Sequence, residues 1–253
     1  MNNILTGRKK KGENIMIYLY SGTPGSGKSL HTARVIYYSL KRGCPVVANF
    51  PINLDKIKGR KSEFIEKDNF SLTPDFLIEY ARNYFHGKPV KEGALLLVID
   101  ECQLMFNARE WNIKGRADWL SFFTQHRKYG YDIILVAQFD RMIDRQIRAL
   151  IEYEQIHRKV SNFGIKGKIL SLCACGKLFV SVKVWYPMKE KVGSEFFKAR
   201  KRYYSLYDTF NSFSAVSEEG GQGGSPTSET VESDLSDSET LERALALLDN
   251  SNT

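Results

Sequence analysis

The 253-residue sequence has few cysteines and no long apolar run. Its four cysteines are too few and too irregularly spaced for a disulfide framework, which favours a reduced, cytoplasmic protein. Cys173 and Cys175 could form half of a metal site, but no second pair of Cys or His ligands has a suitable spacing. No stretch approaches the ~20 apolar residues of a membrane-spanning helix. Residues 1–14 are basic, lack the apolar segment of a signal peptide, and are expected to be a disordered leader.

Basic residues are nearly absent from residues 214–253, which contain one (Arg243) against nine acidic residues. Residues 1–213 therefore hold 36 basic and 20 acidic residues, a net charge of +16. Such a body suits a polyanion or an anionic membrane surface, although dispersed, solvated lysines explain it nearly as well. Residues 214–253 read as a flexible Gly/Ser-rich acidic tail with a short amphipathic helix, which could dock on a partner or on the basic body.

Residues 15–34 contain a phosphate-binding pattern between an apolar strand and a helix. Gly22, Gly27, Lys28 and Ser29 fit G-x-x-x-x-G-K-[ST], the P-loop. Glycines let backbone N–H groups turn towards an anion, Lys28 supplies a charge for the β and γ phosphates, and Ser29 can bind Mg²⁺. The predicted nucleotide-binding residues are Gly22, Thr23, Pro24, Gly25, Ser26, Gly27, Lys28, Ser29 and Leu30.

A second apolar strand ends in two carboxylates. Residues 94–99 are all apolar, as expected of a strand in a parallel sheet covered on both faces, and Asp100 and Glu101 follow. Downstream of a P-loop this is the Walker B pattern. It predicts Asp100 as a Mg²⁺ ligand and Glu101 as the base that accepts a proton from the attacking water. We expect ATP and Mg²⁺ as cofactors and hydrolysis of the triphosphate as the chemistry.

A third apolar strand, residues 132–138, ends in an amide. Gln138 could reach the γ-phosphate or the attacking water as a sensor, or it could simply cap the strand end.

The pattern of elements predicts an α/β fold with a mainly parallel sheet. Helices are expected over residues 30–41, 74–85, 117–128 and 140–149, and another buried strand over 45–49. Residues 52–73 read as an irregular excursion. Residues 151–160, 168–172 and 177–186 read as strands of a β-rich extension (151–213) that follows a core of residues 15–150 and either extends the sheet or packs on its edge.

Residues 193–207 are both basic and aromatic. They could stack on bases and touch phosphates, or form a closing helix that buries its aromatic side chains.

Four segments resemble the zonular occludens toxin (Zot)-like ATPases, which include the assembly ATPases of filamentous phages (inoviruses). They are residues 16–29, ValAlaAsn at 47–49, LeuValIleAspGluCysGln at 97–103, and residues 124–138, in which His126-Arg127 precedes the strand that ends at Gln138. The resemblance implies a RecA-like P-loop NTPase core in which one strand separates Walker B from the P-loop strand.

The resemblance also implies an oligomeric motor that hydrolyses ATP to assemble virions and export phage DNA. A homo-oligomer such as a hexamer-type ring, single-stranded DNA and phage assembly or membrane proteins are the implied partners. An arginine of one subunit is expected to complete a neighbour's site, with Arg127 and Arg148 as candidates. Many family members carry a transmembrane segment after the ATPase domain, where this chain has its linker and acidic tail. We therefore expect a cytoplasmic motor in a bacterial host, recruited by a partner or peripheral to the inner face of the membrane.

Two other functions remain open at this point. One is a nucleotide-switched scaffold whose tail binds partners. The other is a DNA-binding module in plasmid or prophage replication or mobilisation.

Overall fold

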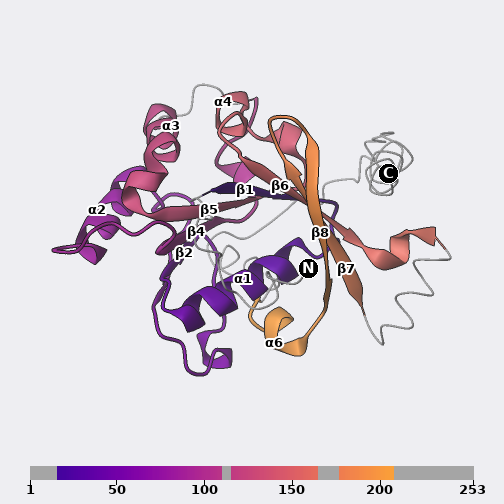
Figure 1. Ribbon diagram of the computed structural model, residues 1–253. Coiled ribbons are helices and arrows are strands. Elements are labelled where there is room, and N and C mark those ends of the chain that lie inside the picture. Colours follow the sequence, from indigo (N-terminus) through magenta and orange to yellow (C-terminus); the bar gives the residue numbers. More distant parts are fainter. Residues whose placement is uncertain (1–15, 110–114, 165–176, 208–253) are drawn as a thin grey trace, which may run out of the picture. The chain divides into compact units, whose positions relative to one another are not determined.

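The computed structural model describes residues 16–109, 115–164 and 177–207, which form an α/β fold around a single eight-stranded sheet (Figure 1). The strand order is β3-β2-β4-β5-β1-β6-β7-β8. In chain order the strands are β1 (Ile17–Ser21), β2 (Val46–Ala48), β3 (Phe64–Glu66), β4 (Leu95–Ile99), β5 (Tyr131–Val136), β6 (Tyr153–Lys159), β7 (Leu178–Trp185) and β8 (Glu190–Lys198).

The sheet is parallel from β3 to β6 and antiparallel from β6 to β8. β5 pairs with β1 on one side and with β4 on the other, so one strand separates the Walker B strand from the P-loop strand. The predicted α/β fold with a mainly parallel sheet is therefore confirmed. Two arrangements were expected for the β-rich part. It extends this sheet, because β6 pairs with β1 in parallel.

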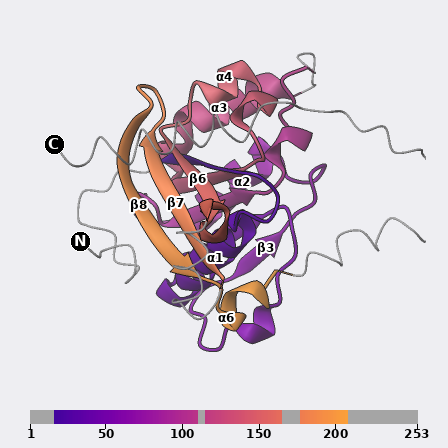
Figure 2. The ribbon, with the colours of Figure 1, turned by 90° about the vertical axis from the view of Figure 1, so that its right-hand side faces the viewer.

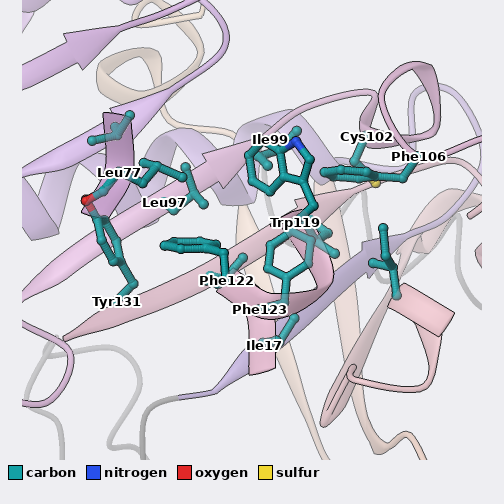
Figure 3. Close-up of a cluster of buried hydrophobic side chains, with 14 of the residues drawn as sticks. Ile17, Leu77, Leu97, Ile99, Cys102, Phe106, Trp119, Phe122, Phe123 and Tyr131 are labelled. Carbon is teal, nitrogen blue, oxygen red and sulfur yellow. The ribbon is translucent and has the colours of Figure 1, made fainter. Parts of the chain in front are cut away.

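One face of the sheet is covered by α2 (Pro74–Tyr84), α3 (Arg116–Gln125) and α4 (Arg145–Arg148). Figure 3 shows the aromatic side chains of α3 packed on the strand residues of this face. Alternate strand residues point here because side chains of a strand alternate between its two faces: Ile17, Leu19, Leu95, Leu97, Ile99, Tyr131, Ile133 and Leu135.

The opposite face is covered by α1 (Lys28–Arg42), with α6 (Lys201–Tyr204) beside it (Figures 1 and 2). The strand residues on this face are the intervening ones: Tyr20, Val46, Ala48, Leu96, Val98, Ile134 and Val136. Because both faces are buried, the central strands are apolar at almost every position, which is why the sequence shows continuous apolar runs rather than alternation.

Local sequence explains the limits of the longer helices. α1 ends at Gly43, which adopts the left-handed conformation (φ 86°) that glycine tolerates. α2 begins after Thr73, whose hydroxyl accepts a hydrogen bond from the Phe76 N–H (3.2 Å), with Pro74 in the first turn. The short 3₁₀ helices are η1 (Leu54–Lys56), η2 (Cys102–Leu104), η3 (His126–Tyr129), η4 (Asp140–Met142) and η5 (Val160–Asn162).

Three expectations about local structure were wrong. The excursion at 52–73 contains β3, which continues the sheet beside β2. The predicted helix over 140–149 is split into η4 and α4. Residues 193–198 belong to β8 rather than to a closing helix, and only α6 is helical in this segment. In each case pairing with a neighbouring strand or loop outweighed a weak local pattern.

Three expectations fall outside the residues that the structure describes. They are the basic leader, the strand at 168–172 and the acidic tail.

Two buried histidines join α1 to the extension behind the P-loop. His31 Nδ1 lies 2.8 Å from His157 Nε2, and His157 Nδ1 lies 3.2 Å from the Ser21 carbonyl oxygen. If His157 Nδ1 donates to Ser21, its Nε2 accepts from His31, so the His157 ring is neutral. Burial lowers the pKa of His157 to about 4 and also lowers that of His31, with the neighbouring histidine adding to the shift at His31. The pair therefore ties the residue before the P-loop to α1 and β6.

We predict that this pair makes the protein less stable in acid. Between pH 6.5 and about 4 the unfolded histidines bind protons that the folded His157 excludes, so the free energy of unfolding falls as the pH is lowered through this range. The slope is at most about 1.4 kcal/mol per pH unit for each histidine. The free energy of unfolding, measured with urea at pH 7 and pH 5, should change less with pH in His157→Gln than in the unchanged chain. The exposed His86→Gln serves as the control, and equal slopes in all three proteins would contradict the prediction.

Candidate functional site

The P-loop connects the carboxyl end of β1 to the first residue of α1. Gly22, Gly25 and Gly27 have positive φ angles of 137°, 74° and 98°. Side chains other than glycine rarely adopt these angles, so the glycines predicted from the pattern are required by the observed backbone.

Two of these glycines also touch the extension. A Cβ added to Gly22 would lie 2.5 Å from the His157 carbonyl oxygen, and one added to Gly27 would lie 2.6 Å from Cδ1 of Phe179. The P-loop therefore packs directly against β6 and β7. A side chain at Gly22 or Gly27 would displace the loop.

The N-terminus of α1 offers its free N–H groups to an anion. Its N-cap is Gly27, which has no side chain to accept these hydrogen bonds, and no acidic residue lies in the first turn. Lys28 Nζ donates to the carbonyl oxygens of Gly22 (2.5 Å) and Thr23 (3.3 Å), so its ammonium lies over the loop. Ser26 Oγ is buried without a hydrogen-bond partner in the described residues. These features fit a bound phosphate.

The Walker B carboxylates lie within electrostatic reach of Lys28. Burial lowers the pKa of Lys28, and the charges of Glu101 and Asp100 oppose this shift. Burial raises the pKa of Asp100 to about 6, and the charge of Glu101 adds to it, while a hydrogen bond from the Glu101 N–H and the charge of Lys28 act in the other direction. The structure therefore brings together the lysine and the two carboxylates that the sequence assigned to one site.

Glu101 is held by its neighbours. It is one of the few described residues other than glycine with a positive φ (45°), and its N–H donates to Asp100 Oδ1 (2.9 Å). Its carboxylate accepts a hydrogen bond from the Nε2 of Gln103, a buried side chain. The carboxylate of the predicted base thus has a defined orientation. Sequence reasoning assigned no role to Gln103, although its position two residues after Glu101 was visible.

Gln138 lies beside the P-loop. Its main-chain carbonyl oxygen accepts a hydrogen bond from the Gly22 N–H (3.1 Å), which ties the segment after β5 to the start of the loop. The carboxyl ends of β1, β4 and β5 therefore carry the P-loop, the carboxylate pair and the amide at one edge of the sheet, where ligands bind in folds of this class. The sensor role of Gln138 stays a prediction.

The available oxygen donors fit Mg²⁺. The Ser29 hydroxyl and the Asp100 carboxylate are hard oxygen ligands, and Ser29 follows Lys28 in the first turn of α1. Mg²⁺ bound with a nucleotide usually takes only one or two protein ligands and uses phosphate oxygens and water for the rest. Among the described residues there is no cluster of three or more Asp, Glu, His or Cys side chains that could hold a metal by themselves.

Both candidate arginines make contacts within their own chain. Arg127 forms an ion pair with Glu152 (2.8 Å), whose N–H donates to the Ile17 carbonyl oxygen at the amino end of β1. Arg127 is therefore at the sheet edge opposite the P-loop. Arg148 in α4 donates to the Asp140 carbonyl oxygen (3.4 Å). That one of these arginines completes the site of a neighbouring subunit stays a prediction.

Comparison with known proteins identifies the family. The family model described as zonular occludens toxin (Zot) matches residues 16–212, most of the chain. The chain belongs to the Zot family. The Gene 1 protein of Enterobacteria phage fd is 30% identical over 170 residues, which cover 64% of this chain and 48% of that protein. The Gene 1 protein of Escherichia phage If1 is 31% identical over 170 residues, or 64% and 47% of the two chains. The chain thus spans about half the length of these curated relatives.

Two solved structures align with most of this chain. A solved ATPase domain aligns with a TM-score of 0.50 at 10% identity, covering 76% of this chain and 84% of that one. The N-terminal domain of zonular occludens toxin from Neisseria meningitidis aligns with a TM-score of 0.48 at 19% identity, covering 77% and 100%. Among the helices that the structure describes, none has the length and apolar character required to cross a bilayer.

We predict that Gly27→Ala weakens nucleotide binding. The change adds strain at a φ of 98° and a contact with Phe179, so we expect a loss of about tenfold or more in affinity, which corresponds to about 1.4 kcal/mol. The control is Gly87→Ala, where φ is also positive (69°) but an added Cβ meets nothing within 4 Å. Titration with a fluorescent ATP analogue measures both. Equal affinities in the two variants would show that the contact is unimportant.

Proposed function

We propose that this Zot-family chain is an ATP-hydrolysing motor for filamentous-phage-type virion assembly and DNA export. The observation that carries the proposal is the convergence of Lys28, Asp100 and Glu101 at the carboxyl edge of a P-loop fold. In this proposal Lys28 and the loop N–H groups bind the phosphates, while Ser29 and Asp100 hold Mg²⁺. Glu101 takes the proton of the attacking water and Gln138 senses the γ-phosphate.

The arrangement supports hydrolysis rather than binding alone. A P-loop is sufficient to bind a nucleotide, but a carboxylate beside the metal ligand is needed to accept a proton from water. In support of this role, Glu101 is next to Asp100 and its carboxylate accepts a hydrogen bond from Gln103. When bound, Mg²⁺ would neutralise charge on the phosphates, and the proton transfer would remain with the protein.

The remaining features of the motor follow from family membership and charge. The Gene 1 proteins that match are phage proteins. Single-stranded DNA suits the net charge of +16 in residues 1–213. We further propose a homo-oligomer in which Arg127 or Arg148 completes a neighbour's site. The motor would work at the cytoplasmic side of the host membrane with phage assembly or membrane proteins as partners.

Glu101→Gln should bind ATP but hydrolyse it slowly. The amide keeps the size of the side chain but cannot accept the proton, so kcat should fall by about 10²–10⁴-fold while nucleotide affinity stays similar. Steady-state phosphate release and equilibrium titration separate the two quantities. Glu79→Gln, on the exposed side of α2, is the matched control and should hydrolyse ATP normally. Undiminished hydrolysis by Glu101→Gln would remove Glu101 as the base.

Single-stranded DNA should raise the ATPase rate of the full chain in low salt. The affinity should fall as salt increases, because binding releases counterions from the strand; with about four phosphate contacts, a change from about 50 to about 200 mM salt weakens binding roughly 50-fold. Titration of the ATPase rate with DNA at both salt concentrations measures this. A rate that DNA leaves unchanged at either concentration argues against a DNA motor and favours a nucleotide-switched scaffold.

A further inference from the structure

Asn49 lies immediately after β2 and reaches the residue that follows β4. Its Oδ1 accepts a hydrogen bond from the Asp100 N–H (2.7 Å), and its Nδ2 donates to the Asp100 carbonyl oxygen (2.9 Å). Nδ2 also donates to Oδ1 of Asn69 (2.8 Å). The side chain of Asn49 therefore holds both polar groups of the Asp100 main chain at once.

These bonds extend the sheet by one residue beyond its backbone ladder. Ala48 of β2 is paired with Val98 of β4, and both strands end within one residue of that pair. An amide side chain carries both a donor and an acceptor and so can take the place of a peptide group. In place of Asn49, an aspartate would lack the donor, and a leucine would lack both the donor and the acceptor. Asn49 thus supplies a contact that the backbone of β2 no longer provides.

The contact falls where the chain turns away from the sheet. Glu101 has a positive φ of 45°, a conformation that is unfavourable for residues other than glycine. Its N–H donates to Asp100 Oδ1, so the Asp100 carboxylate is held from one side by Glu101 and its main chain from the other by Asn49. Within this turn the Leu104 N–H donates to the Glu101 carbonyl oxygen (2.8 Å), and Asn49 adds the two bonds to the Asp100 main chain.

Asn69 is itself held in place. The Lys67 N–H donates to the Ala48 carbonyl oxygen (3.0 Å), which continues the β2–β3 contact. The Asp68 carboxylate accepts hydrogen bonds from the Phe70 N–H, the Ser71 N–H and the Ser71 hydroxyl, all at 2.8 Å. Hydrogen bonds therefore hold the chain on both sides of Asn69, which places Asn69 where it can orient the Asn49 amide.

We propose that Asn49 is a positioning residue that sets the place of the Asp100 carboxylate for Mg²⁺, with Asn69 orienting its amide. Asn49 acts through Asp100 and not on the nucleotide. The proposal rests on the proposed function, because it assigns a supporting residue to the same site. Partners that orient a metal ligand typically contribute a factor of 10–100 to metal affinity or activity.

The first test measures the nucleotide-free protein. Hydrogen exchange at the Asp100 amide, followed by NMR, should be roughly fivefold faster or more in Asn49→Ala, because the acceptor of this N–H is removed. Asn83→Ala, an exposed asparagine of α2, is the control and should leave exchange at Asp100 unchanged. Unchanged exchange at Asp100 in a folded Asn49→Ala protein would overturn the proposal.

The second test measures binding of a fluorescent ATP analogue with and without Mg²⁺. Metal-free affinity should be the same in Asn49→Ala and the unchanged chain, because the P-loop is intact. The Mg²⁺ concentration that half-saturates the metal-dependent gain in affinity should rise by about 10–100-fold. An equal loss of affinity with and without Mg²⁺ would indicate general damage to the fold and would contradict the positioning role.

Asn69→Ala provides a second variant if Asn49→Ala does not fold. It keeps both bonds between Asn49 and Asp100, so it should raise the required Mg²⁺ concentration in the same direction but by less. An unchanged Mg²⁺ requirement in this variant would show that Asn69 does not orient the Asn49 amide. Where Asn49→Ala is unfolded, the same result would refute the proposal. Absence of hydrolysis in the unchanged chain would instead refute the proposed function, and the exchange and binding measurements would still test Asn49.

Discussion

The contact between the P-loop and the strands of the extension constrains the whole nucleotide site. Gly22 lies against the main chain of β6 and Gly27 against Phe179 of β7, with no room for a side chain at either position. The same region holds the buried pair of His31 and His157, and Arg34 of α1 forms an ion pair with Glu195 of β8 (2.5 Å). The extension therefore shapes the loop that would bind phosphate. A change in β6 or β7 would alter the geometry of that loop.

A second constraint is the burial of the charged groups of Lys28 and Asp100. Burial disfavours the charged forms of both Lys28 and Asp100, and their opposite charges partly offset this. Glu101 adds a further negative charge beside Asp100. Two adjacent carboxylates near one lysine can accommodate a divalent cation together with the phosphates that bind it. The electrostatics thus agree with the proposed hydrolysis of a nucleotide bound with Mg²⁺.

Features encoded by neighbouring residues could be predicted. The Thr73-Pro74 start of α2 and the apolar run of β4 depend on local chemistry or on burial of a continuous segment. Features that depend on a distant partner could not. β3 is only three residues long and pairs with β2. β8 pairs with β7. Short or charged strands carry little signal of their own, since the neighbouring strand supplies most of their stabilisation.

The sequence by itself determined the P-loop, the carboxylate pair and the family, because each depends on residue types at fixed spacing along the chain. Only the tertiary structure decided that Arg127 lies at the opposite edge of the sheet and that Asn49 holds the main chain of Asp100. These relations join residues far apart in sequence through hydrogen bonds and packing. Their geometry exists only once the strands have taken their order in the sheet.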